Sequence, residues 1–352
     1  MSKFLKKIAS YLYGAGIRIR NFLFDTGILR SERFDIPIIC VGNITVGGTG
    51  KTPTAEMIVD SLCDECRVAL LSRGYGRRTK GYREVAVTDS YRDTGDEPLQ
   101  IKMKFPDVVV VVCEDRVAGI RRIRAEHPEV SVIVMDDGFQ HRRVTPWVNV
   151  VVIDSTRPVD KDYLLPYGEL RDTRSSLSRA NYFIVTKCSD DMSPLDRRLM
   201  RKVLQRAAYQ RIYFMRHELL PLRRVFAVDA ETEDAIPEPS RKEDEVIAMC
   251  GIGNPSVFVE DMRRRYTLVD SLVLNDHHVY CVGDLKVMAE KLVEHPSASI
   301  VTTEKDAVKL FNSKKIPAAL RERMFYVPVR LAYIEDSDKD FLKNIHKDVR
   351  SN

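Results

Sequence analysis

The sequence predicts an α/β protein with two lobes: a larger lobe built on a parallel sheet flanked by helices, and a smaller α/β lobe joined to it by two linker strands. Short, nearly continuous runs of β-branched residues alternate with helical patterns between Ile38 and Thr186. This alternation is typical of parallel strands covered by helices on both faces. A second strand–helix alternation begins near Val246, and a length of 352 residues accommodates two domains.

The larger lobe is expected to span residues 34–222 and to be completed by residues 335–352. Its strands are predicted where apolar runs are bounded by polar or glycine-containing segments. These runs are Ile38–Val41, Val68–Ser72, Val108–Cys113, Val132–Met135, Val148–Ile153 and Tyr182–Thr186. In a sheet of this kind, ligands gather at the carboxyl ends of the strands.

The smaller lobe and its linker strands are expected within residues 223–334. An acidic, proline-containing stretch, Ala230–Glu245, marks the boundary, and a helix is predicted to end near Tyr266. Linker strands are predicted at Val225–Val228 and Phe325–Tyr333. The other predicted strands of this lobe are Val246–Cys250, Leu272–Leu274, Ile300–Thr303 and Met324–Val329.

The N-terminal segment, residues 1–33, is basic and amphipathic. It carries seven basic and two acidic side chains, so its net charge of +5 equals that of the whole chain. Large apolar residues between Phe4 and Phe24 are interleaved with these charges. Such a segment suits the surface of an anionic membrane. It also suits an ordinary helix docked on the core, and both interpretations stay open.

The rest of the composition indicates a cytosolic protein. No run approaches the 18 or so apolar residues of a membrane-spanning helix, and Arg18 and Arg20 interrupt the early apolar stretch, which argues against a secretory signal. The seven cysteines are scattered, as expected for a reducing compartment. Residues 34–352 carry equal numbers of basic and acidic side chains, which argues against a broad nucleic-acid-binding surface.

The stretch VGNITVGGTGKTP, residues 41–53, nearly matches the phosphate-binding loop pattern G-x-x-x-x-G-K-[ST]. Thr45 stands where the pattern has its first glycine. A predicted strand precedes the stretch and a predicted helix follows it, so backbone amides and the helix N-terminus can face phosphates. Lys51 would reach the β- and γ-phosphates, and Thr52 would bind magnesium. The predicted nucleotide contacts are Thr45, Val46, Gly47, Gly48, Thr49, Gly50, Lys51 and Thr52. The larger lobe is therefore expected to be a P-loop lobe, and the loop alone leaves open whether it is P-loop kinase-like or of the hydrolytic switch type.

Acidic and basic groups follow other predicted strands. Asp136 and Asp137 end the run Val132–Met135, where a phosphate-loop protein places a magnesium ligand, and spacing leaves open which of them binds the ion. The segment Ser72–Arg83 has five cations and no acid. It suits an anionic substrate, single-stranded nucleic acid with tyrosines as stacking platforms, or a solvated basic loop.

Two further stretches can supply a general base. Asp96 lies in TGDEP, bounded by glycine and proline, and His277 lies in NDHHVY of the smaller lobe. Phosphoryl transfer to an alcohol uses a base, commonly an aspartate, to accept the hydroxyl proton. A helix cap for Asp96 and a polar turn for His277 are the structural alternatives.

Together these stretches resemble one family, the tetraacyldisaccharide 4′-kinases of Gram-negative lipid A biosynthesis. The resemblance covers roughly residues 37–310, with the motifs in family order, and Thr45 agrees with the small residue that the family has there. Asp172 stands where glutamate is more usual. The motifs are VGNITVGGTGKTP, LLSRGYGR, TGDEP, MDDGFQHRR, LLPYGELRD, CGIGNP, NDHHVY and VTTEKDAVKL.

The resemblance implies phosphorylation, dependent on ATP and Mg²⁺, of the 4′-hydroxyl of a tetraacyl glucosamine disaccharide 1-phosphate. It implies Asp96 as the catalytic base, supported from the other lobe by His277, with His278 as the alternative. Lobe closure would then complete the site. The implied metal ligands are Thr52, Asp136 and Asp137, and the implied substrate residues are Tyr75, Gln140, His141 and Arg171.

The resemblance also implies where the protein works. An acyl-chain substrate lies in a membrane while ATP is cytosolic, so we expect a peripheral protein on the cytoplasmic face of the inner membrane. The expected partners are the lipid A disaccharide precursor and the anionic membrane surface, without nucleic acid or an obligate protein partner. The main alternative is a membrane- or DNA-associated P-loop ATPase switch. Such switches carry a signature lysine where this chain has Val46, which argues against that class.

Overall fold

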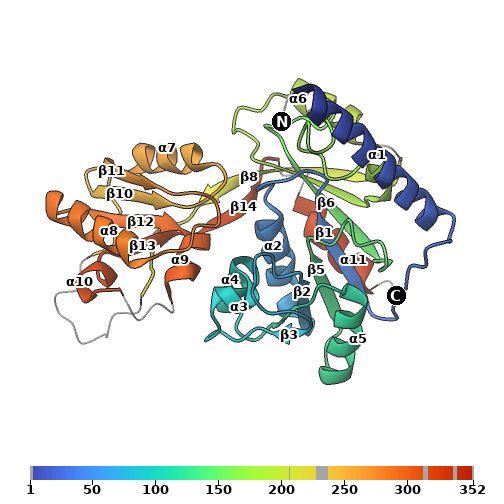
Figure 1. Cartoon of the computed structure of the whole chain (residues 1–352), viewed down its shortest axis with the longest axis horizontal. Helices are drawn as coiled ribbons and strands as arrows, with labels where there is room; N and C mark the ends of the chain where they lie inside the picture. Colours follow the sequence, from blue (N-terminus) through green and yellow to red (C-terminus); the bar gives the residue numbers. More distant parts are fainter. Residues whose placement is uncertain (1–2, 206, 227–236, 312–315, 336–338, 351–352) are drawn as a thin grey trace.

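The computed structural model describes residues 3–205, 207–226, 237–311, 316–335 and 339–350. The strands of these residues form two sheets, one of nine strands and one of five. Figure 1 shows the two sheets in separate lobes, the larger on the right and the smaller on the left, each with helices packed against it. This arrangement confirms the predicted α/β fold class with a mostly parallel sheet.

The larger sheet has a parallel centre with antiparallel strands at its two edges. The parallel strands are β1 (Ile38–Gly42), β2 (Val68–Ser72), β4 (Val109–Val112), β5 (Val132–Asp136), β6 (Val148–Asp154), β7 (Tyr182–Thr186) and β8 (Arg211–Leu219). The edges are β3 (Arg83–Glu84) and β14 (Val329–Tyr333). Their order is β14-β8-β7-β6-β1-β5-β2-β4-β3, with β1 near the centre.

Helices cover both faces of this sheet, and alternate residues of β1 show why. Ile38 and Cys40 belong to one buried apolar cluster, and Ile39 and Val41 belong to a second. The second cluster includes Phe341, so the C-terminal helix packs on that face. The helices are α1 (Lys3–Asp25), α2 (Lys51–Cys63), α3 (Tyr91–Thr94), α4 (Asp96–Lys104), α5 (Arg116–Glu126), α6 (Pro194–Leu204) and α11 (Phe341–Arg350), with a 3₁₀ helix at Arg174–Arg179.

The smaller sheet has the order β11-β10-β12-β13-β9. Four strands are parallel, namely β10 (Glu245–Cys250), β11 (Thr267–Val273), β12 (Ser299–Thr303) and β13 (Met324–Val327), and β9 (Arg223–Arg224) is antiparallel. Its helices are α7 (Pro255–Arg265), α8 (Val282–Glu294), α9 (Glu304–Phe311) and α10 (Ala318–Arg321). The carboxyl ends of β11 and β12 lead into the loop of His277 and into α9.

The linker strands differ from the prediction. The strand predicted at Val225–Val228 is wrong for Val225 and Phe226, because the strand β9 lies at Arg223–Arg224 instead. The rest of that prediction, residues 227 and 228, lies outside the described residues, as do residues 230–236 of the acidic stretch. The strand predicted at Phe325–Tyr333 is wrong as one unit. It divides at Pro328 into β13 of the smaller sheet and β14 of the larger sheet. Proline has no amide hydrogen for a ladder, so it suits this switch between sheets.

Helix α1 lies across the outside of the larger lobe (Figure 1). It docks through a narrow stripe, since Ser10, Gly14 and Ile17 are its buried residues. Ser10 Oγ donates to the carbonyl of Leu164 at 2.7 Å, and a side chain at Gly14 would collide with Leu164. No helix among the described residues is long and apolar enough to cross a membrane.

Candidate active site

The phosphate-loop stretch connects the end of β1 to the start of α2. Gly47 and Gly50 have φ angles of 84° and 89°, in the left-handed region that glycine adopts without strain. Gly50 directly precedes the first residue of α2, Lys51, and a Cβ on Gly50 would lie 3.1 Å from the Thr186 methyl group. The loop therefore turns tightly, and the N-terminus of α2 can face an anion.

A neighbouring segment supports the first half of the loop. The amide of Val46 donates to the Glu169 carbonyl at 2.9 Å, and the amide of Arg171 donates to the Ile44 carbonyl at 2.7 Å. Thr45 is buried and forms a bridge with Leu170. The backbones of Ile44 and Val46 thus anchor the first half of the loop to the neighbouring segment. Phosphate contacts for the predicted set, residues 45–52, stay a prediction.

The two aspartates after β5 have different surroundings. The register pairs Asp136 with Val41 at the end of β1, so it lies beside the phosphate loop. Asp136 is 1% exposed, and burial, with Glu97 and Asp137 nearby, raises the pKa of its carboxyl to about 7. The Asp137 side chain is 31% exposed. Its partial burial would raise its pKa, but hydrogen bonds from Arg171 at 2.7 and 3.1 Å and the charge of Lys51 lower the pKa to about 2.

These carboxylates fit a divalent cation. Among the described residues, no hydrogen bond reaches the buried Oδ1 atom of Asp136, and buried polar atoms normally have a partner. Hard oxygen ligands are those that magnesium prefers. Thr52 lies in the first turn of α2, directly after the loop, and the end of β5 at Asp136 pairs with β1 directly before the loop.

Asp96 and His277 meet between the two lobes. Asp96 is the first residue of α4, after Gly95 with a φ of 93°, and is 6% exposed. His277 Nδ1 lies 3.1 Å from Asp96 Oδ2. Burial would raise the pKa of Asp96, but the His277 hydrogen bond and Lys305 lower it, and the same hydrogen bond raises the pKa of His277. His278 instead contacts Asp284 of its own lobe at 2.9 Å.

Lys305, on α9, is a site residue that the sequence reasoning missed. Its Nζ lies 3.8 Å from carboxylate oxygens of Asp96, Glu97 and Asp276, and 3.3 Å from His277 Nε2. A signal existed, because Lys305 follows the predicted strand Ile300–Thr303 at the edge where ligands gather. The sequence could not show that this edge faces Asp96.

The four predicted substrate residues lie in three different places. Tyr75 is 71% exposed, and its ring centre lies 5.5 Å from that of His277, so it lies beside the Asp96–His277 contact. Gln140 donates to the Asn43 carbonyl at 2.7 Å, and Arg171 also bonds Asn43, so both hold the start of the phosphate loop. His141 is half-buried, and burial together with Arg116 lowers its pKa to about 4. A role for these four residues at the substrate stays a prediction.

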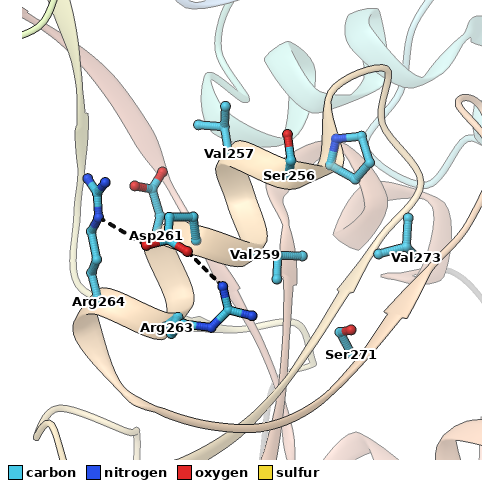
Figure 2. Close-up of a pocket in the computed structure, with 10 residues that line it drawn as sticks. Ser256, Val257, Val259, Asp261, Arg263, Arg264, Ser271 and Val273 are labelled. Atoms are coloured by element: carbon cyan, nitrogen blue, oxygen red, sulfur yellow. Dashed lines mark hydrogen bonds and ion pairs between the residues drawn. The ribbon is translucent and has the colours of Figure 1, made fainter.

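A shallow groove of about 680 Å³ lies elsewhere, on the outer side of the smaller lobe. Figure 2 shows it between α7 and β11, with Val257, Val259 and Val273 around it and ion pairs along the helix. None of the predicted site residues lines this groove. This groove is therefore separate from the predicted site residues.

Comparisons with known proteins show to which family this chain belongs. The model of the family LpxK, described as tetraacyldisaccharide-1-P 4′-kinase, matches residues 2–349. This chain belongs to that family. A tetraacyldisaccharide 4′-kinase of Parabacteroides distasonis is 40% identical over 344 residues, covering 97% of this chain and 93% of its own, and that of Phocaeicola vulgatus is 37% identical over 347 residues, with 97% and 94% covered.

A solved structure agrees with this assignment. The LpxK of Aquifex aeolicus, determined in complex with ATP, has a TM-score of 0.76 and 28% sequence identity, and the match covers 99% of this chain and 100% of that one. The resemblance inferred from the motifs is thereby confirmed.

Proposed function

We propose that this chain transfers the γ-phosphoryl group of ATP to the 4′-hydroxyl of a tetraacyl glucosamine disaccharide 1-phosphate, a lipid A precursor. The chain is a kinase of the LpxK family, with ATP and magnesium as cofactors, as the family and the ATP complex of its relative indicate. The observation that carries the residue assignments is the Asp96–His277 contact between the lobes. Helix α4, which begins at Asp96, is also bonded to α2, the helix that follows the phosphate loop: Gln100 of α4 donates to the Glu56 carboxylate of α2 at 2.8 Å.

The nucleotide would lie on the phosphate loop. We assign the phosphate contacts to the amides of the loop glycines and to Lys51, whose charge balances the β- and γ-phosphates. Thr52, Asp136 and Asp137 would hold magnesium, which when bound neutralises charge on the transferring phosphoryl group. Asp137 already bonds Arg171, whereas Asp136 has an oxygen without a partner among the described residues, so we propose Asp136 as the direct ligand.

Asp96 would accept the proton of the 4′-hydroxyl as that oxygen attacks the γ-phosphorus. His277 Nδ1 holds one carboxylate oxygen of Asp96, and the amide of Glu97 donates to the other at 3.0 Å. Two such contacts fix the direction of the carboxylate, and a base with fixed geometry is worth about 10²- to 10⁴-fold in rate. Tyr75, beside His277, is placed to border the sugar.

The decisive test is incubation with γ-labelled ATP and the tetraacyl disaccharide 1-phosphate in mixed micelles. Label in a lipid with a second phosphate, at the 4′ position, is the expected result. Label only in free phosphate would overturn the kinase assignment and favour a P-loop ATPase switch.

We further propose that α1 binds the cytoplasmic surface of the inner membrane. Among its residues, Phe4, Leu12 and Phe22 are 72%, 71% and 60% exposed, and several large apolar side chains exposed on one helix are typical of a surface that binds a membrane or a partner. Basic residues of the same helix suit anionic headgroups. Partners would then be the lipid substrate and the membrane, without nucleic acid or an obligate protein partner.

A further inference from the structure

Lys305 contacts the base from the opposite lobe. Its Nζ lies 3.8 Å from Asp96 Oδ2 and 3.3 Å from His277 Nε2, and its side chain is 21% exposed. With Nδ1 of His277 directed at Asp96, Nε2 faces the ammonium group. Two groups of the smaller lobe, an imidazole and an ammonium, therefore hold one carboxylate of the larger lobe.

The neighbours of Lys305 in α9 fix its position. Glu304 lies 3.7 Å from Lys104, and Lys104 bonds the buried carboxylate of Glu56 at 2.6 Å, so this end of α9 is tied to α4 and α2. Asp306 accepts the amide of Gly251 at 2.8 Å and is fully buried in its own lobe. The lysine thus projects from a backbone that is held on both sides.

The charges around Asp96 show what Lys305 contributes. Asp96 contacts His277 and Lys305 from the smaller lobe, with Asp276 beyond His277, and Glu97 adjoins it on α4. Lys309 adds a weaker charge effect, since its ammonium group is paired with Asp306 at 2.9 Å. Burial and the adjoining carboxylate both disfavour a charged Asp96. The Lys305 ammonium group opposes them at every pH at which Asp96 would act, whereas the His277 imidazole loses its charge as the pH rises through its folded pKa.

We propose that Lys305 is a positioning residue for phosphoryl transfer: its ammonium group keeps Asp96 ionised as the base and holds α4 against the His277 loop. The proposal rests on the proposed role of Asp96. It predicts that the charge of Lys305, more than its shape, sets the acid limit of activity.

The test compares Lys305→Met and Lys305→Arg across a pH series, with the labelled-ATP assay in mixed micelles. Lys305→Met should lower kcat about 10- to 100-fold near neutrality, because the Asp96 carboxylate and α4 are held less firmly, and should leave the KM for ATP within about twofold. It should also move the acid limb of kcat upward by about one pH unit or more, because a positive charge beside Asp96 is lost. Lys305→Arg should return the acid limb to its wild-type position. Lys286→Met, at an exposed lysine of the same lobe, should match the wild type.

A second measurement does not depend on kinase activity. Removing a neighbouring positive charge makes it easier to protonate His277, so its imidazole NMR signals should titrate at higher pH in Lys305→Met than in the wild type. A lower rate with an unmoved acid limb and an unmoved His277 titration would overturn the proposal. If the wild type failed to label the lipid while the His277 titration still moved, the proposed function would fail and the electrostatic role of Lys305 would stand. Circular dichroism of each variant verifies that it folds.

Discussion

At the scale of single residues, the candidate site is formed by side chains that lie far apart in the sequence and contact one another in the fold. Asp96 and His277 are separated by 181 residues, yet their side chains are hydrogen-bonded. The sequence predicted both residues from their motifs but could not choose between His277 and His278, because two adjacent histidines lie at almost the same distance along the chain from every other motif. The structure separates them, since His278 contacts Asp284 within the smaller lobe. Lys305 was missed because its partners come from other elements.

Asp96→Asn should abolish most transfer and leave nucleotide binding intact. The amide keeps the size of the side chain but cannot accept the hydroxyl proton, so we expect kcat to fall about 10²- to 10⁴-fold. ATP affinity should stay within about twofold, because the phosphate loop does not include Asp96. The measurements are labelled-lipid formation and calorimetric titration with ATP. Asp64→Asn, an exposed aspartate beyond α2, is the matched control. Full turnover by Asp96→Asn would reject the base assignment.

The Asp96–His277 pair should stabilise the protein within a defined pH window. The pKa of His277 is raised by its hydrogen bond to Asp96, so this stabilisation is complete below the unfolded pKa of about 6.5 and is lost as the pH rises through the folded value. The lowered pKa of Asp96 means that the stabilisation is lost again only in strong acid, below about pH 3.8.

We therefore expect His277→Gln to lower the melting temperature most near pH 5–6, and progressively less as the pH rises above neutrality. Scanning calorimetry across this range is the measurement. In an Asp96→Asn background the same substitution should produce no such pH dependence. A constant difference at all pH values would show that the pair does not carry a titrating charge.

At the scale of elements, apolar patterning predicted the buried strands and failed at the margins of the sheets. β2 and β7 occupy the predicted ranges, because central strands are apolar on both faces. β8 was missed: it carries Arg216, His217 and Glu218 where it approaches the edge strand β14. The division at Pro328 was missed because the residues on both sides of it have strand-like composition. Whether such segments form strands, and in which sheet, depends more on their tertiary contacts than on their local β-propensity.

The exposed apolar face of α1 gives a test of membrane binding. Leu12 is 71% exposed, so Leu12→Glu should leave the melting temperature unchanged. A glutamate cannot be buried among acyl chains and repels anionic headgroups, so binding to anionic phospholipid vesicles should weaken about tenfold or more. Vesicle co-sedimentation measures this. Leu195→Glu, at a leucine of α6 that is 63% exposed, is the control. Unchanged binding of Leu12→Glu would leave α1 as a docked surface helix.

At the scale of the whole molecule, two separately built lobes share one site. The smaller lobe has its own buried clusters around β10 and β12, and charged side chains from both lobes meet at Lys104–Glu304 and Lys305–Asp96. Val308 of α9 adds an apolar contact with the core of the larger lobe. The sequence predicted two lobes from the restart of the strand–helix pattern, but nothing in a linear pattern shows how two lobes face each other. The assignment of residues 34–222 with 335–352 to one lobe and 223–334 to the other stays a proposal, as does lobe closure during catalysis.

Because charged groups meet between the lobes, salt should loosen their association. Raising the ionic strength from about 0.05 to 0.5 M shortens the range of electrostatic attraction from more than 10 Å to less than 5 Å, and interfaces between domains commonly permit relative motion. We expect the radius of gyration from small-angle X-ray scattering to increase with salt while the circular dichroism of the folded lobes stays constant. The Lys104→Met variant should have a larger radius of gyration than the wild type at low salt, and that radius should change less when salt is added. The reason is that the ammonium group linking Glu56 to Glu304 is lost. Equal radii for the wild type at both salt concentrations would mean that apolar packing, led by Val308, holds the lobes together, and lobe opening would then have to be driven by substrate.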